Sequence, residues 1–138
     1  MDFEEAKQKA IKYLGISKKT KYEVEQKLKR VGYSQEIIDM VISYLLDIGY
    51  INDIDYVQSY IRQNERFLSY SVFEIKQKLL QKGIKKDIIE KEIIPLEESG
   101  YDKELIKKLD NTKCKGMEPL KRKQYLYRRG LRIDLSEE

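Results

Sequence analysis

The stretch EQKLKRVGYSQEII, from Glu25 to Ile38, occurs a second time in nearly the same form. Fifty-one residues further along, residues 76–89 read KQKLLQKGIKKDII, so that Gln, Lys, Leu, Gly and a pair of Ile recur at matching positions. A third and fainter copy, KQYLYRRGLRIDL, occupies residues 123–135. Self-similarity at a fixed period is the sequence signature of a chain built from tandem structural repeats.

The apolar residues around these copies follow a helical period. Phe3, Ala6 and Ala10 recur at intervals of three or four residues, which predicts the buried stripe of a helix. Val24 and Leu28 continue the same spacing in the next segment, and strict alternation, the strand pattern, is not sustained anywhere. The predicted helices are 3–14, 20–31, 35–48, 53–67, 72–82, 86–98, 102–110 and 118–129.

The residues at the helix boundaries support this division. Thr20 and Glu23 have the spacing of a capping box, in which each side chain satisfies a free backbone amide of the first helical turn. Ser71 and Glu74 repeat that spacing in the second copy. Glycines suited to a left-handed stop residue follow the helices; they are Gly32, Gly49, Gly83, Gly100 and Gly130.

Three features depart from the repeat. Glu118 and Pro119 begin the last helix, where we expect a carboxylate acceptor at the cap and a proline whose missing N–H is not needed. Pro95 lies inside the sixth helix and is expected to kink or shorten it. After Gly130 too few residues remain for a full third helix.

We therefore predict an all-α fold of tandem three-helix-bundle repeats in an elongated array, with the third repeat truncated. The predicted divisions are repeat 1 over 1–50, repeat 2 over 51–100, and a partial repeat 3 over 101–138 that carries a basic C-terminal helix. A repeat of this length buries little surface alone, so the copies are expected to cover one another's apolar faces.

The residues that usually carry chemistry are scarce. The sequence has no histidine, and its one cysteine, Cys114, has no second thiol at metal-ligand spacing. We interpret Cys114 as an incidental thiol in a polar loop, and phosphate-cradling glycine motifs are absent. We expect no enzyme activity, no catalytic residues, no metal and no cofactor. The acidic N-terminus, the short apolar runs and the single cysteine predict a cytoplasmic protein without a membrane segment. We expect a monomer, although the sequence does not give the oligomeric state.

The net charge of +4 is concentrated at one end of the sequence. Residues 1–100 hold 17 basic and 17 acidic side chains, whereas residues 101–138 hold 11 and 7. Such a field favours an anionic partner. The candidate contact residues are Lys121, Arg122, Lys123, Arg128, Arg129 and Arg132. The second candidates, in the middle repeat, are Arg62, Lys78, Lys82, Lys85 and Lys86.

The tyrosines divide into two groups. Tyr13, Tyr44 and Tyr60 lie in helical apolar phase, which favours packing in the core. Tyr125 and Tyr127 stand among basic residues, a mixture suited to a phosphate backbone or an acidic protein groove, although a solvated helix face is the alternative.

Arg122 occupies the position of the stripe residues Val24 and Ile75 in the earlier copies. Because an unpaired buried cation is costly, we expect either a splayed third repeat or a helix rotated so that Arg122 points outward.

Two stretches resemble the RecX family of bacterial recombination regulators: YINDIDYVQSYIRQ, residues 50–63, and SVFEIKQKLLQKGI, residues 71–84. The matching positions are Asp53, Tyr56, Tyr60, Arg62, Leu79, Lys82 and Gly83. The resemblance covers residues 5 to 135 and implies three-helix repeats that lie on the filament formed by the RecA recombinase on single-stranded DNA.

The resemblance further implies a regulator that limits filament growth, ATP hydrolysis and strand exchange in DNA recombination, DNA repair and the SOS response. Single-stranded DNA would be contacted directly or through the filament. An alternative from another class stays open at this point, namely a helical module that binds nucleic acid without sequence preference. A helical adaptor for an unrelated protein is the third possibility.

Overall fold

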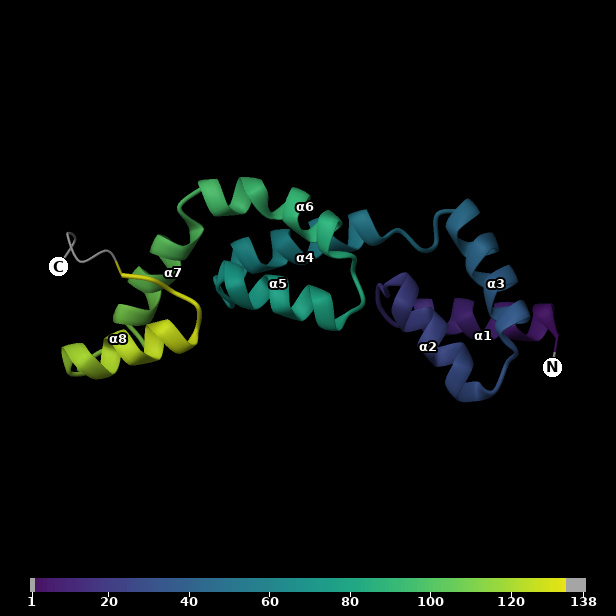
Figure 1. The fold of residues 1–138 in the computed structure, drawn as a ribbon, viewed down its shortest axis with the longest axis horizontal. Helices are drawn as coiled ribbons and strands as arrows, with labels where there is room; N and C mark the ends of the chain where they lie inside the picture. Colours follow the sequence, from purple (N-terminus) through teal and green to yellow (C-terminus); the bar gives the residue numbers. More distant parts are fainter. Residues whose placement is uncertain (1, 134–138) are drawn as a thin grey trace.

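The computed structural model describes residues 2–133, and these form eight helices and no strand. Figure 1 shows an elongated chain of helices rather than a single bundle. The helices are α1 (Phe3–Leu14), α2 (Lys21–Val31), α3 (Gln35–Asp47), α4 (Asp53–Phe67), α5 (Val72–Gln81), α6 (Lys86–Glu98), α7 (Tyr101–Asp110) and α8 (Pro119–Arg128). We refer to α1–α3 as module 1, to α4–α6 as module 2, and to α7–α8 as module 3.

The predicted all-α class is confirmed, and every predicted helix is present with ends that differ by at most one residue. Both capping boxes form. The hydroxyls of Thr20 and Ser71 accept hydrogen bonds from the backbone amides of Glu23 and Glu74, and the side chains of these glutamates accept in turn from the backbone amides of Thr20 and Ser71. The turn glycines take the left-handed conformation, with φ of 107° at Gly32. The boundaries between the repeats, placed at residues 50 and 100 from the sequence, stay a prediction.

One prediction about helix ends needs correction, and one of the two alternatives for Pro95 is excluded. Glu118 stands at the N-cap of α8, but its side chain makes no cap hydrogen bond. Pro95 does not shorten α6, which continues to Glu98. Proline lacks the N–H that bonds the carbonyl four residues earlier, and its ring crowds that carbonyl, but in the last turn few helical residues follow it. Residues 131–133 are not helical, and residues 134–138 lie outside the described part of the chain.

The apolar residues form two cores instead of three. Module 1 has its own core, in which Ala6 and Ala10 of α1 allow close approach to Leu28 and Val41. The second core begins at Val57 in module 2 and continues without a break into module 3; its members there are Tyr101, Leu105, Leu109, Cys114, Leu126 and Leu131. Module 3 therefore depends on module 2 for its burial.

Cys114 belongs to this second core. It is 4% exposed, so the expectation of a thiol in a polar loop is wrong. Burial raises the pKa of the Cys114 thiol, with the carboxylate of Asp110 adding to that effect. The polar residues next to Cys114 in the sequence give no sign that the thiol itself packs into the second core.

The junctions between modules repeat one polar arrangement. At the first junction the buried Thr20 hydroxyl, which already accepts the Glu23 amide, donates to the carbonyl oxygen of Lys82 at 2.6 Å. At the second junction the buried Ser71 hydroxyl donates to the Arg129 carbonyl oxygen. Each hydroxyl therefore caps its own helix and joins it to the helix end of the next module.

An aromatic contact accompanies each of these hydrogen bonds. Gly83 and Gly130 have φ of +80° and +76°, and a Cβ atom added to them would lie 2.2 Å from the Cβ of Tyr22 and 2.5 Å from that of Phe73. Only glycine fits both the backbone conformation and the approach of the ring. These contacts fix how each module follows the previous one.

Candidate functional site

Charge is sorted by helix position within the modules. The second helices, α2, α5 and α8, together hold ten basic and three acidic residues, whereas the third helices, α3 and α6, hold two basic and eight acidic residues. In the view of Figure 1, α2, α5 and α8 each lie below the other helix or helices of their module, and α3 and α6 lie above. We call α2, α5 and α8 the second-helix row. The second helices are thus net basic and the third helices net acidic.

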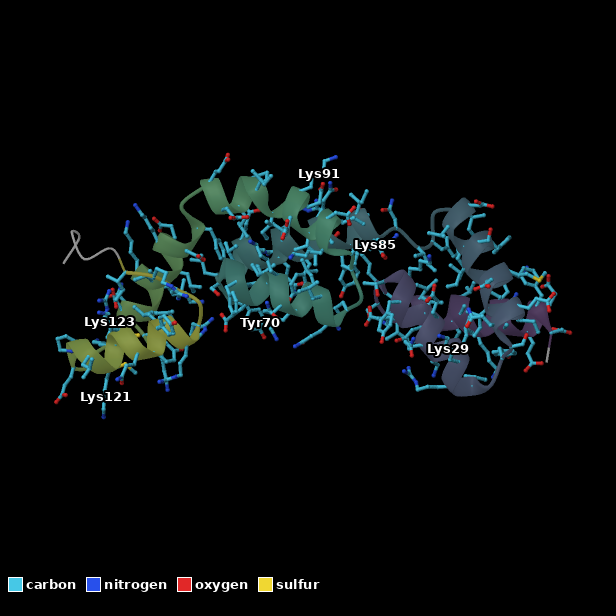
Figure 2. The ribbon with its side chains drawn as sticks, in the orientation of Figure 1. Lys29, Tyr70, Lys85, Lys91, Lys121 and Lys123 are labelled. Atoms are coloured by element: carbon cyan, nitrogen blue, oxygen red, sulfur yellow. The ribbon has the colours of Figure 1, made fainter. Side chains whose placement is uncertain are left out.

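The strongest part of this row is α8. Lys121, Lys123 and Arg128 are exposed there, and Figure 2 shows Lys121 and Lys123 extending away from the helix. Leu120 and Tyr127 on the same helix are 66% and 64% exposed. A hollow of about 540 Å³ follows this face, and its lining residues carry no acidic group: Leu120, Lys123, Gln124, Tyr127 and Arg128. An anionic surface can approach here without meeting a carboxylate.

Arg132 continues the exposed basic face beyond α8. Its guanidinium carbon lies 4.3 Å from the centre of the Tyr127 ring, a cation–π contact. The contact holds the guanidinium next to the ring without using its hydrogen-bond donors. The aromatic and basic mixture predicted from the sequence is therefore present at Tyr127.

Arg129 is placed differently. Its guanidinium binds both carboxylate oxygens of Glu74 at 2.8–3.0 Å and donates to the Ser69 carbonyl oxygen at 2.8 Å. Burial alone would raise the pKa of Glu74, but hydrogen bonds from Arg129 and Ser71 hold it below the ordinary value. Arg129 therefore joins module 3 to module 2.

Arg122 adopts neither of the two expected arrangements. Its side chain is 25% exposed, and its guanidinium binds both carboxylate oxygens of Asp110 at 2.7 and 3.1 Å. A paired cation at a core position avoids the cost of an isolated buried charge. Module 3 is therefore not splayed to release Arg122.

The second set of candidates is scattered. Lys82 pairs with Glu23 across the first junction at 3.5 Å, and Lys78 lies over the ring of Tyr70. The remaining three are exposed: Arg62 bonds the Ser59 hydroxyl, Lys85 is the N-cap residue of α6, and Lys86 pairs with Glu90 at 3.8 Å. The structure does not bring this set together on one surface.

The core prediction for three tyrosines holds only in part. Tyr60 is half-buried and packs on the second core, whereas Tyr44 is 36% exposed. Tyr44 follows the apolar phase of α3, but its ring lies at the edge of the helix face, beside Phe3 and the Lys7 ammonium. Tyr13 is half-buried and packs on the first core, as predicted, and the ammonium groups of Lys19 and Lys27 lie near its ring.

The surroundings of Tyr13 form a second basic region that the sequence prediction missed. Residues 7–30 contain nine basic and two acidic side chains, the same net charge of +7 as residues 113–132. Residues 31–61 contain five acidic and no basic side chains, so a sum over the first hundred residues hides the excess. A charge count in shorter windows would have revealed it.

Two other features, a metal-holding cluster and a membrane-spanning helix, are not found among residues 2–133. Residues 2–133 contain no group of three or more histidine, cysteine, aspartate or glutamate side chains that could hold a metal ion. None of the helices described is long and apolar enough to cross a membrane.

Comparison with known proteins agrees with the geometry of the array. The family descriptions of the first and second three-helix domains of RecX match residues 6–45 and 52–92. A regulatory protein RecX from Caldanaerobacter subterraneus subsp. tengcongensis is 30% identical over 135 residues, which cover 97% of this chain and 68% of that protein. This chain belongs to the RecX family.

The likeness extends to three dimensions. The crystal structure of RecX from Lactobacillus salivarius superposes with a TM-score of 0.78 at 28% identity, covering 98% of this chain and 90% of that one. The regulatory protein RecX of Prosthecochloris aestuarii is 34% identical over 89 residues. The match spans only 59% of the Prosthecochloris protein, so this RecX chain corresponds to part of some of its relatives.

Proposed function

We propose that this RecX chain is a regulatory protein that binds the filament of RecA on single-stranded DNA and inhibits its growth, ATP hydrolysis and strand exchange. The observation that carries the proposal is that α2, α5 and α8, the second-helix row, are net basic, whereas α3 and α6 are net acidic. A filament is a repeating, polyanionic partner, and an elongated row of cations suits such a partner better than a single compact patch does.

The strength of binding would come from many modest contacts. Exposed lysines contribute little individually in water, but contacts spread along rigidly joined modules act together. The repeated junctions at Thr20 and Ser71 hold the modules in a fixed order, so α2, α5 and α8 keep fixed positions along the array. We assign the main charged contact to Lys121, Lys123, Arg128 and Arg132, and keep the two paired arginines as structural.

The test compares the full chain with a variant carrying Lys121→Gln, Lys123→Gln and Arg128→Gln. Binding is measured to preformed RecA–DNA filaments and to the same DNA without RecA. We expect the wild-type chain to prefer the filament, and the variant to lose filament affinity by about tenfold or more with an unchanged helix content. A variant that binds filaments as tightly as the wild type would contradict the proposed surface.

The second candidate, a nucleic-acid-binding module without a RecA partner, is favoured by the exposed ring of Tyr127 beside Arg132. It predicts equal affinity for bare strands and filaments. It also predicts that the logarithm of the binding constant falls linearly with the logarithm of the salt concentration, with a slope of about 0.7 to 0.9 for each phosphate neutralised. The same pair of titrations therefore separates the two functions.

A further inference from the structure

We propose that a lysine-lined hollow in module 1 is a binding site for the phosphate backbone of single-stranded DNA, with Tyr13 as the surface on which a base stacks. The hollow has a volume of about 270 Å³. Its lining residues are Lys9, Lys12, Tyr13, Ile16, Lys27 and Val31.

Three lysines from two helices converge on this hollow. Lys9 and Lys12 come from the last two turns of α1, and Lys27 comes from α2, which packs beside it. No acidic side chain lines the hollow, and none of the three ammonium groups has an ion-pair partner among the described residues. Like charges held together without a counter-ion are unfavourable until an anion enters.

Tyr13 lies at the centre of this arrangement. The ammonium groups of Lys19 and Lys27 lie 4.7 and 5.6 Å from the centre of its ring. Ile16, next to the ring, is 79% exposed. A positively charged groove with a partly exposed aromatic ring and an exposed aliphatic neighbour is the arrangement by which proteins hold single strands without reading their sequence.

The composition of the hollow favours phosphate over carboxylate. All its cations are lysines, which attract phosphates and carboxylates alike as point charges, so the choice between the two rests on the neighbouring Tyr13 and Ile16. Tyr13 and Ile16 would also have little to contact on a strongly acidic peptide. The observations therefore favour a nucleic-acid strand over an acidic protein segment.

This inference rests on the proposed function, because it gives the array a direct contact with the DNA that the filament contains. The hollow and α8 lie in opposite end modules, so one chain would hold the strand at one end and the filament surface at the other (Figure 1). The two contacts can be tested separately.

The experiment measures the affinity of the full chain for a fluorescently labelled dT oligonucleotide at several salt concentrations. The variant Lys9→Gln/Lys12→Gln/Lys27→Gln should bind about tenfold or more weakly, and its salt slope should fall by about 2, since each single-strand phosphate contributes about 0.7. The matched control, Lys91→Gln/Lys103→Gln/Lys107→Gln, removes three exposed charges elsewhere and should stay within about threefold of the wild type. Tyr13→Leu should lose about tenfold through stacking, at an unchanged salt slope.

Two results would overturn the site. Equal losses in the lysine variant and its control would show that only total charge matters. Displacement of the oligonucleotide by poly-glutamate as readily as by unlabelled dT would assign the hollow to acidic polypeptides. The proposed function is judged separately, by RecA-filament binding of the wild-type chain. If the wild-type chain binds the filament but not dT, the site is overturned and the proposed function stands. If it binds dT as tightly as the filament, the proposed function is overturned and the site stands.

Discussion

Replacing Arg129 by alanine should destabilise the second junction strongly, although this residue lies in the most basic part of the sequence. The substitution removes the two-oxygen pairing with Glu74 and the hydrogen bond to the Ser69 carbonyl, in a pair whose side chains are only 18% and 25% exposed. Breaking a fully buried pair costs about 3–5 kcal/mol. In the variant, the Glu74 carboxylate still contacts solvent and still accepts a hydrogen bond from the Ser71 amide. We therefore expect the free energy of unfolding to fall by about 3 kcal/mol.

The first junction supplies the matched control. Lys82 occupies the position of Arg129 there and pairs with Glu23, but the distance is 3.5 Å and the lysine is 45% exposed. Lys82→Ala should therefore cost less than about 0.5 kcal/mol. Both variants keep the backbone carbonyl that accepts the Thr20 or Ser71 hydroxyl, so the difference between them isolates the side chain.

The assay is urea unfolding followed by far-ultraviolet circular dichroism, with amide hydrogen exchange to locate the effect. Arg129→Ala should accelerate exchange in α7 and α8, and leave module 1 protected as before. Equal losses in the two variants, or a loss in Arg129→Ala below about 1 kcal/mol, would refute the assignment of Arg129 to the junction.

Four further results are expected. Gly83→Ala should cost about 3 kcal/mol because strain at positive φ adds to the clash with Tyr22, whereas Gly49→Ala, with the same φ and nothing within 4 Å, should cost about 1 kcal/mol in urea unfolding. Because the pKa of Glu74 is lowered in the folded state, its contribution to stability is present above the ordinary value of 4.5 and is lost as the pH falls through the lower folded-state pKa; acid titrations of unfolding should show this dependence in the wild type and not in Arg129→Ala. The charge-removing variant of Lys121, Lys123 and Arg128 should unfold within about 0.5 kcal/mol of the wild type, since all three side chains are exposed. Cys114 should react with a thiol reagent slowly in the folded chain and quickly in urea, because burial limits access and raises its pKa; fast reaction without urea would contradict its place in the core.

The helices could be predicted from the sequence because their signals are local. The apolar period, the boxes beginning at Thr20 and Ser71, and the turn glycines each involve residues a few positions apart. These local signals do not predict that the Thr20 and Ser71 hydroxyls also join one module to the next. That second role depends on a carbonyl 62 or 58 residues away, and no local pattern reports it.

The candidate site was predicted less well, for a related reason. A cation in a sequence carries no sign of whether a carboxylate lies beside it in the fold, so Arg129 looked equivalent to Arg128, and Arg122 at its stripe position was expected to point outward or to splay the repeat rather than to be paired. Their partners, Asp110 and Glu74, come from other helices. The lysines around Tyr13 were missed because the charge was summed over too long a segment, in which the acidic α3 cancelled them.

The most direct test of the account is single-strand-dependent ATP hydrolysis by a preformed RecA filament as this RecX chain is added. The wild-type chain should lower hydrolysis progressively at well below one molecule per RecA subunit. The variant lacking the charges of Lys121, Lys123 and Arg128 should require far more protein, and the control lacking Lys91, Lys103 and Lys107 should act as the wild type does. Hydrolysis that is unchanged by saturating wild-type protein, or lowered equally by all three, would contradict the claim that the second-helix row binds and regulates the filament.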